Sequence, residues 1–291
     1  MQAAVVAPAG PFSREELRKA LQAAATQGLE VHLAPHVRAF YEGQEPPSSW
    51  PYLFADDGRR REDFLWALRG EFPLIWCARG GYGSMRLLET LEEADLRRAK
   101  GRMLLGFSDI TALLSAWHAH GGVAVHGPSF LDLGEEGDWG PLWSFLREGF
   151  RGRRYTFPQA VTLSGGKARG PIRGGNLSLL AHLLGTPFFP DLEGAILLIE
   201  DVHEPLYRLD RMLTQLRMAG VLKGVAGILW GTTRIPREED GSSLHRLLLD
   251  RLGDLKVPIL ADLPFSHEMP RWPLPLVEAH LDADRKELTL R

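Results

Sequence analysis

Residues 103–111 read MLLGFSDIT, and this stretch decides the class of fold. An apolar run ends at a glycine, and a helical pattern begins two residues after it. A serine at such a strand-to-helix turn, here Ser108, presents its hydroxyl at the edge of a sheet, beside helix N-terminal amides. The match to the usual G-x-S-x-G turn is partial, because Ile110 occupies the last position. Ser108 is therefore either a nucleophile or only the cap of the helix that follows, aided by Asp109.

Strand-like and helix-like patterns alternate around this stretch through the first 135 residues. Strands are predicted at 3–7, 29–34, 74–78 and 103–107, and helices at 13–27, 59–69, 84–99 and 110–119. Alternation of this kind is typical of a parallel sheet covered by helices. The sequence thus predicts an α/β fold with a flavodoxin- or Rossmann-like N-terminal domain over residues 1–135.

The alternation weakens over residues 136–168, which we expect to form a linker region. A second, smaller α/β domain is predicted over residues 169–291. Its strands are expected at 195–199, 225–230 and 257–261, its helices at 206–218 and 242–252, and a β-hairpin over 276–290. The chain therefore divides into two domains, as its length of 291 residues also favours.

Composition excludes several classes of partner. The formal net charge is −3, so neither a nucleic acid nor an anionic membrane is an expected partner. The run Arg59-Arg60-Arg61 is followed by two acids and is interpreted as a solvated helix face. The single cysteine, Cys77, excludes an intrachain disulfide and is expected to be buried. We see no signal peptide and no apolar stretch long enough to span a membrane, so we expect a cytoplasmic protein.

A serine nucleophile needs a histidine base that is oriented by a carboxylate. His267 follows the strand predicted at 257–261, and a loop beyond a strand is well placed for catalysis. Glu200 ends the apolar run 196–199, where a carboxylate is unfavourable without a partner. The alternative is that Glu200 forms a salt bridge with Arg208 or Arg211.

Other motifs carry weaker signals. The H-x-H pair His118 and His120 has no third ligand beside it, so no metal is expected. The run 80–83, GGYG, lacks the third glycine of a dinucleotide motif, and no cofactor is expected. The run 174–176, GGN, precedes a helix and forms either an anion site or a tight turn. His126 is either structural or close to the site.

Together these stretches resemble the LD-carboxypeptidase family, serine peptidases that are also called muramoyltetrapeptide carboxypeptidases. The resemblance extends over most of the chain. It rests on 7–10 (APAG), 56–60 (DDGRR), 79–88 (RGGYGSMRLL), 106–113 (GFSDITAL), 126–128 (HGP), 174–178 (GGNLS), 185–187 (GTP) and parts of 199–213.

The resemblance implies a role for each matching residue. Ser108 would be the nucleophile, Glu200 the orienting acid and His267 the general base. Backbone N–H groups of Asp109 and of the Gly80-Gly81 turn, with Gly81 as the chosen donor, would form the oxyanion hole. Substrate contacts are expected from Gly80, Tyr82 and Asn176. The nucleophile and the base would lie on different domains, so the active site is expected in the cleft between them.

The implied reaction is hydrolysis of the amide between an L-configured diamino acid centre and the terminal D-alanine of a murein tetrapeptide, in cell-wall recycling. The family resemblance also suggests a homodimer. Two departures surround His267: Ser266 stands where the family has glycine, and Val277 replaces the glycine of a Leu-Pro-Leu-Gly stretch.

Two other functions remain alternatives. A relative like the microcin self-immunity peptidases would cleave a peptidyl or aminoacyl nucleotide, with Trp230 or Trp272 as a platform for the base. A protein of another class would bind murein peptides without cleaving them.

Overall fold

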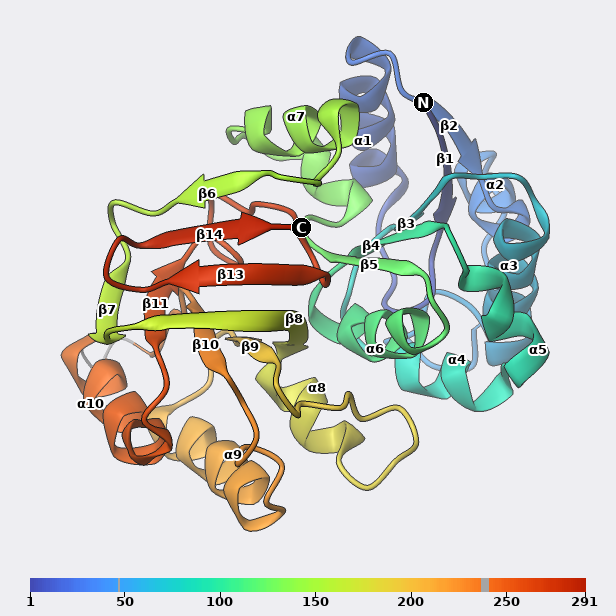
Figure 1. Ribbon diagram of the computed structural model, residues 1–291. Coiled ribbons are helices and arrows are strands. Elements are labelled where there is room, and N and C mark those ends of the chain that lie inside the picture. Colours follow the sequence, from blue (N-terminus) through green and yellow to red (C-terminus); the bar gives the residue numbers. More distant parts are fainter. Residues whose placement is uncertain (47, 237–240) are drawn as a thin grey trace. The chain divides into compact units, whose positions relative to one another are not determined.

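The computed structural model (Figure 1) describes residues 1–46, 48–236 and 241–291, and the chain divides into two units. The first unit is Met1–Trp139 and the second is Gly140–Arg291. Most of the stretch that we predicted as a linker, 136–168, is regular structure of the second unit, and that expectation is corrected. Its glycines and prolines interrupt short elements, and the pattern resembles a loop for that reason.

The five strands of the first unit are parallel. They are β1 (Gln2–Val6), β2 (Glu30–Leu33), β3 (Leu74–Cys77), β4 (Met103–Gly106) and β5 (Val123–His126). Their order in the sheet is β2-β1-β3-β4-β5, and every pairing is parallel. This is the flavodoxin-like order, so the fold class predicted for this half is confirmed.

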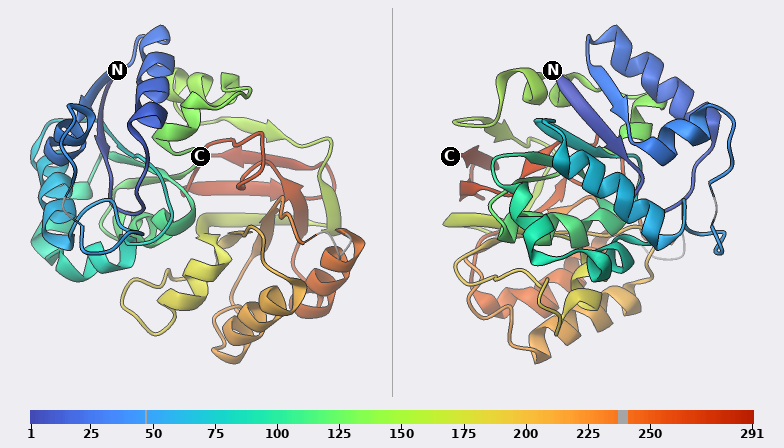
Figure 2. Two further views of the ribbon diagram at one scale, coloured as in Figure 1. Left: turned by 180° about the vertical axis from the view of Figure 1, so that it is seen from behind. Right: turned by 90° about the vertical axis from the view of Figure 1, so that its right-hand side faces the viewer.

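Helices cover this sheet, with α1 (Arg14–Thr26) on one face and α3 (Asp57–Arg69) on the other (Figures 1 and 2). The predicted capping box at the start of α1 is present, because Ser13 and Glu16 bond each other's backbone N–H groups. The remaining elements are α2 (Pro35–Tyr41), α4 (Ser84–Thr90), α5 (Glu93–Leu96), α6 (Thr111–Ala119) and the 3₁₀ turns η1 (Arg97–Ala99), η2 (Ser108–Ile110) and η3 (Phe130–Gly134).

The helix predicted over 84–99 is wrong in its length. It ends at Thr90, because Leu91 is extended and Glu92 begins a new capping box with Asp95. The short helix α5 and the turn η1 follow.

The strand order of the first unit fixes where its functional loops meet. Strand β1 pairs with β2 on one side and with β3 on the other, so the direction of the chain reverses between β1 and β3. In open α/β sheets the carboxyl ends of the strands at this reversal form the binding crevice. The loops after β1, β3 and β4 begin at Ala7, Ala78 and Phe107, and these loops carry the resemblance motifs.

The second unit is built on one mixed sheet. Its strands are β6 (Arg154–Thr156), β7 (Val161–Ser164), β8 (Lys167–Asn176), β9 (Ile196–Glu200), β10 (Gly227–Gly231), β11 (Ile259–Leu263), β13 (Glu278–Asp282) and β14 (Glu287–Leu290), and the short β12 is Leu274–Pro275. The order is β6-β14-β13-β8-β9-β10-β11-β7. The central run β8-β9-β10-β11 is parallel, and the outer pairings are antiparallel. The predicted hairpin is β13–β14.

Three helices bury the apolar face of these parallel strands (Figure 1). They are α8 (Leu177–Leu183), α9 (Leu206–Met218) and α10 (Gly241–Leu252), while α7 (Gly140–Glu148) and the turn η4 (Gly253–Leu255) complete the unit. Leu209, Leu213 and Leu216 of α9 recur at helical spacing and are fully buried in this core. This packing holds the carboxyl end of β9, where Glu200 lies, in a fixed place.

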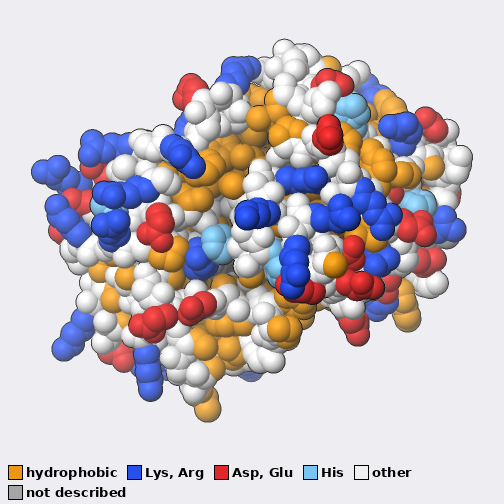
Figure 3. All heavy atoms as spheres, turned by 45° about the vertical axis from the view of Figure 1, so that its right-hand side comes forward, with side chains coloured by type: hydrophobic (Ala, Val, Ile, Leu, Met, Phe, Trp, Pro, Cys, Tyr) orange, Lys and Arg blue, Asp and Glu red, His pale blue; other side chains and the backbone are white. Residues whose placement is uncertain are grey.

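The surface carries charges of both signs. On the face drawn in Figure 3, acidic and basic side chains are interspersed, unlike the basic stripe typical of a nucleic-acid interface. Within the described residues, the helices are too short or too polar to cross a membrane.

Candidate active site

Ser108 lies in a strained turn at the end of β4. Its φ is 61°, in the left-handed region that residues with a side chain seldom adopt. The 3₁₀ turn Ser108–Ile110 leads directly into α6, and neither helical segment has a side-chain capping hydrogen bond at its start. The interpretation of Ser108 as a helix cap is therefore not supported. The turn holds a half-buried hydroxyl at the sheet edge, as a nucleophile would require.

The loop after β3 approaches this serine so closely that it requires glycine. A Cβ atom on Gly80 would lie 2.9 Å from Cβ and 3.1 Å from Oγ of Ser108. Gly81 follows with a φ of 107°, and Gly10 of the loop after β1 donates its N–H to the carbonyl of Gly80 at 3.0 Å. The loop after β1 thus holds the loop after β3, which in turn lies against the serine.

The side chain of Asp109 anchors the turn that carries Ser108. Its carboxylate is buried and accepts the N–H of Ser84 at 2.8 Å, while the Ser84 hydroxyl donates to the backbone carbonyl of Asp109. Burial raises the pKa of this carboxyl, although the hydrogen bonds from Ser84 act against that rise. The side chain is thus structural, and only the backbone N–H of Asp109 is suited to the predicted oxyanion role.

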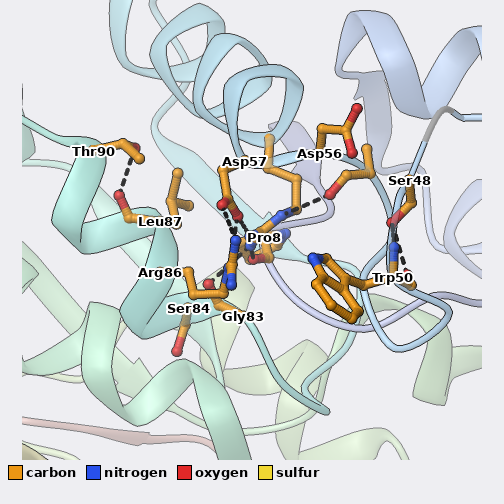
Figure 4. A network of polar contacts seen from close by, with 12 residues as sticks. Pro8, Ser48, Trp50, Asp56, Asp57, Gly83, Ser84, Arg86, Leu87 and Thr90 are labelled. Carbon is orange, nitrogen blue, oxygen red and sulfur yellow. Dashed lines mark hydrogen bonds and ion pairs between the residues drawn. The ribbon is translucent and has the colours of Figure 1, made fainter.

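A buried arginine, Arg60, fixes the loops after β1 and β3. Arg60 is only 1% exposed, and its guanidinium donates to the carbonyls of Ala55 (3.0 Å), Gly83 (2.9 Å) and Pro8, and to the carboxylate of Asp57. Figure 4 labels three of these partners, Pro8, Asp57 and Gly83. Our expectation that this basic run forms a solvated helix face is therefore wrong for its middle member. Arg60 ties the loops after β1 and β3 to the start of α3.

Replacing Arg60 with leucine should lower the free energy of unfolding by about 3 kcal/mol, because three buried carbonyls lose their donor. Urea denaturation of the full chain measures this. The matched control is Arg59→Leu: Arg59 is exposed on the same helix, and its loss should change stability by less than about 0.5 kcal/mol. Equal effects of the two changes would contradict the anchoring role.

In the second unit the structure brings Glu200 and His267 together. Nδ1 of His267 lies 2.6 Å from Oε2 of Glu200, whose side chain is fully buried at the end of β9. Burial by itself lowers the pKa of His267, but the charge of Glu200 and this hydrogen bond outweigh it, so the pKa is raised. The hydrogen bond leaves Nε2 as the ring nitrogen able to take a proton.

A second glycine allows this pair to form. A Cβ on Gly231, at the end of β10, would lie 2.8 Å from Cβ of Glu200 and 2.4 Å from the carbonyl oxygen of Phe265. Ser266, the departure from the family pattern, is buried, and its hydroxyl accepts the N–H of Glu268 at 3.1 Å. The serine thus adds a hydrogen bond within the loop that carries His267.

Polar groups beneath Glu200 hold the acid in place. Asn176 caps α8 through its Oδ1, and its amide donates to Glu200 (3.3 Å) and to Asp201 (3.1 Å). The N–H and hydroxyl of Ser178 also donate to Asp201, at 3.0 and 2.8 Å. Asn176 is only 4% exposed. Asn176, which we predicted to contact the substrate, is therefore buried against Glu200 and does not lie at the surface.

Several other residues that the sequence analysis considered lie in structural positions. His126 is buried, with its ring edge-on to Phe107, and His120 contacts Glu93 at 2.9 Å. Among the residues that the structure describes, none form a cluster of three metal-binding side chains. Cys77 is buried as expected, which raises the pKa of its thiol.

The aromatic platform proposed for a nucleobase needs correction at Trp230. Trp230 is fully buried in β10, because its strand is covered by helices, so its ring is not available to a ligand. Trp272 stacks at 6.0 Å on Tyr155 within the second unit. The exposed aromatic side chains in the loop after β3 and in the segment that contacts it are instead Tyr82, Tyr52 and Trp50. Of these, only Tyr82 was predicted from the sequence.

The parallel sheet with a serine in a left-handed turn at its edge is compatible with a hydrolase, and comparison with known proteins specifies the class and the family. A model of the LD-carboxypeptidase N-terminal domain matches residues 3–127, and one of the C-terminal domain matches residues 169–280. The chain therefore belongs to the LD-carboxypeptidase family, as its sequence motifs predicted.

Individual relatives agree with this assignment. The murein tetrapeptide carboxypeptidase of Pseudomonas aeruginosa is 35% identical over 277 residues, which cover 91% of this chain and 87% of the relative. The muramoyltetrapeptide carboxypeptidase of Oxalobacter formigenes has a similar structure, with a TM-score of 0.83 at 27% identity over 100% of this chain and 98% of that one. A microcin C7 self immunity protein shares the fold, with a TM-score of 0.88 at 20% identity over 99% and 95% of the two chains.

Proposed function

We propose that this protein is a serine-type LD-carboxypeptidase that releases the terminal D-alanine from a murein tetrapeptide. The bond cleaved joins D-alanine to the L-configured centre of a diamino acid. The observation that carries this proposal is the left-handed turn at Ser108, with Gly80 packed against its side chain. Such a turn is expected of a nucleophile, and the family membership supplies the class of substrate.

In the proposed reaction, Ser108 Oγ attacks the scissile carbonyl while Nε2 of His267 accepts the hydroxyl proton. Glu200 holds the imidazole in the required tautomer and stabilises the imidazolium that forms. The oxyanion is stabilised by the backbone N–H groups of Asp109 and Gly81. D-alanine leaves with a proton from His267, and water then hydrolyses the acyl-enzyme.

The three predicted substrate contacts take different parts in this proposal. Gly80 and Tyr82 belong to the turn beside Ser108 and are suited to contact the peptide. Asn176 acts indirectly, as a positioning residue, because its amide is occupied by Glu200 and Asp201. This positioning role is supported by the burial of the side chains of Asn176, Glu200 and Asp201.

We further propose that the protein acts in the cytoplasm as a homodimer. Its one cysteine is buried and unpaired, which fits a reducing compartment. The family resemblance suggests the dimer, and sedimentation of the purified protein at several concentrations tests it; a monomer at all of them would contradict it.

The test of the proposed function is release of free D-alanine from a purified murein tetrapeptide. Release by the wild-type protein supports the carboxypeptidase assignment. If the protein is inert on the tetrapeptide but cleaves an aminoacyl nucleotide, the alternative chemistry of the family applies. If it binds the tetrapeptide and cleaves neither substrate, it is a binding protein.

Replacing Gly80 with alanine should reduce kcat for D-alanine release by about 100-fold, because the new Cβ displaces the Ser108 side chain. The matched control is Gly58→Ala on α3, where a Cβ meets nothing within 4 Å and should leave kcat unchanged. Steady-state kinetics and thermal unfolding distinguish displacement from misfolding. A Gly80→Ala protein with wild-type kcat would show that the contact has no catalytic consequence.

A further inference from the structure

Three exposed aromatic side chains form a continuous array on the first unit. The ring of Trp50 stacks on that of Tyr52 at 5.6 Å and 23°, and Tyr52 meets Tyr82 at 5.6 Å and 71°. The three side chains are 48, 43 and 48% exposed. Clustered aromatic rings that remain exposed to solvent mark ligand-binding surfaces more often than isolated ones do. We call this set of three residues the aromatic array.

The segment that carries Trp50 is held in place by hydrogen bonds (Figure 4). The hydroxyl of Ser48 accepts the N–H of Trp50 at 3.2 Å and donates to its carbonyl at 2.7 Å. The N–H of Leu53 donates to the same carbonyl at 3.1 Å, and the N–H of Phe54 donates to the carbonyl of Ala9 at 3.0 Å. The rings are therefore presented by an anchored segment.

This anchored segment packs on the turn that borders Ser108. A Cβ on Gly83 would lie 2.9 Å from the side chain of Leu53, so the segment packs on the turn that contains Tyr82. The same turn begins at Gly80, which lies against Ser108. The aromatic array is therefore joined to the turn beside Ser108 through Tyr82, which lies between Gly80 and Gly83.

The cation on the helix that follows Tyr82 already has a carboxylate partner. Arg86, on the helix after Tyr82, donates from Nε to Asp57 at 3.1 Å and also from Nη2 to the same carboxylate (Figure 4). Its charge is thus compensated by a carboxylate, whereas a nucleotide phosphate is bound best by a cation without such a partner. A pyranose ring suits the array, because its apolar C–H face packs on aromatic rings while its hydroxyl groups stay in water.

We propose that the aromatic array binds the sugar ring attached to the amino end of a murein peptide. This inference rests on the proposed function, which places the scissile carbonyl at Ser108. Three peptide residues separate that carbonyl from the sugar, and they span about 10 Å when extended. The array begins at Tyr82, two residues after the Gly80 that lies against Ser108, and continues through Tyr52 and Trp50 with ring-to-ring distances of 5.6 Å.

The experiment compares the affinities of two ligands, muramoyl-tetrapeptide and the same tetrapeptide without the sugar. Calorimetric titrations use the Ser108→Ala protein, which does not consume the ligand. We expect the sugar to improve the affinity about tenfold. In the same background, Tyr52→Ala or Trp50→Ala should abolish this gain, so that the two ligands bind about equally well. The matched control is Tyr41→Ala, which removes a tyrosine of similar exposure (40%) from the end of α2 and should leave the tenfold gain intact.

The outcomes separate this inference from the proposed function. If wild-type protein releases D-alanine but the sugar brings no gain, the array does not bind the sugar and the proposed function stands. If the gain is present and depends on Tyr52, but no D-alanine is released, the sugar site stands and the carboxypeptidase proposal falls. A Tyr52-dependent gain for an aminoacyl nucleotide, with none for the sugar, would overturn the inference in favour of a nucleobase site.

Discussion

Replacing Ser108 with alanine should lower the rate of D-alanine release by about 10⁵- to 10⁶-fold, the size of loss seen when a serine nucleophile is removed. The reason is that the covalent step disappears, while the backbone donors of Asp109 and Gly81 remain. Ser108 forms no helix cap, so stability should not fall; relief of its left-handed conformation is not expected from alanine, which has the same Cβ.

The measurement is single-turnover release of D-alanine from a murein tetrapeptide, with thermal unfolding in parallel. Ser115→Ala is the matched control, because Ser115 lies on α6, the helix that follows the nucleophile turn, and should retain activity within about twofold. A Ser108→Ala protein that still turns over the tetrapeptide at a wild-type rate would place the nucleophile elsewhere.

Replacing Glu200 with glutamine should lower kcat/KM by about 10⁴-fold. Glutamine fits the same fully buried position but carries no charge, so it neither stabilises the imidazolium of His267 nor enforces its tautomer. Glu148→Gln is the control: Glu148 pairs with Arg153 at 3.1 Å on the surface, and its change should not affect the reaction.

The pH profile gives this variant a second readout. A general base must be neutral, so wild-type kcat/KM should rise with pH through the pKa of His267, which Glu200 raises. Without that charge, burial of the ring dominates and lowers the pKa, so the acid limb of Glu200→Gln should move to lower pH. An acid limb that stays in place would mean that another group limits the rate.

The fold and the buried position of Glu200 could be predicted from the sequence because both depend on local patterns, while the catalytic roles stay predictions. Uninterrupted apolar runs such as Leu74–Cys77 predict buried parallel strands, and two acids that end such a run, as at Glu200, indicate a buried carboxylate with a partner. The glycine-rich β8, Lys167–Asn176, was not predicted as a strand, because its glycines are typical of turns and their strand role depends on neighbouring strands.

Arg60 shows how a local pattern misleads. Three consecutive arginines suggested one solvated face, but the helical period places Arg60 on the same side as the buried Phe64 and Ala67, and this signal could have separated it from Arg59. The aromatic array had no such signal. Trp50 and Tyr52 are distant in sequence from Tyr82, and only the folded chain shows that they meet.

The connection between α2 and α3, which carries Trp50 and Tyr52, lies outside the strand scaffold that builds the nucleophile turn. Loops of this kind accept substitutions and length changes more readily than the elements they join. Mutations in this connection therefore alter the aromatic array without changing the strand order that positions Ser108. Ligand preference can therefore evolve separately from hydrolytic chemistry. Descendants of one ancestral enzyme can recognise different ligands while they retain the same reaction mechanism.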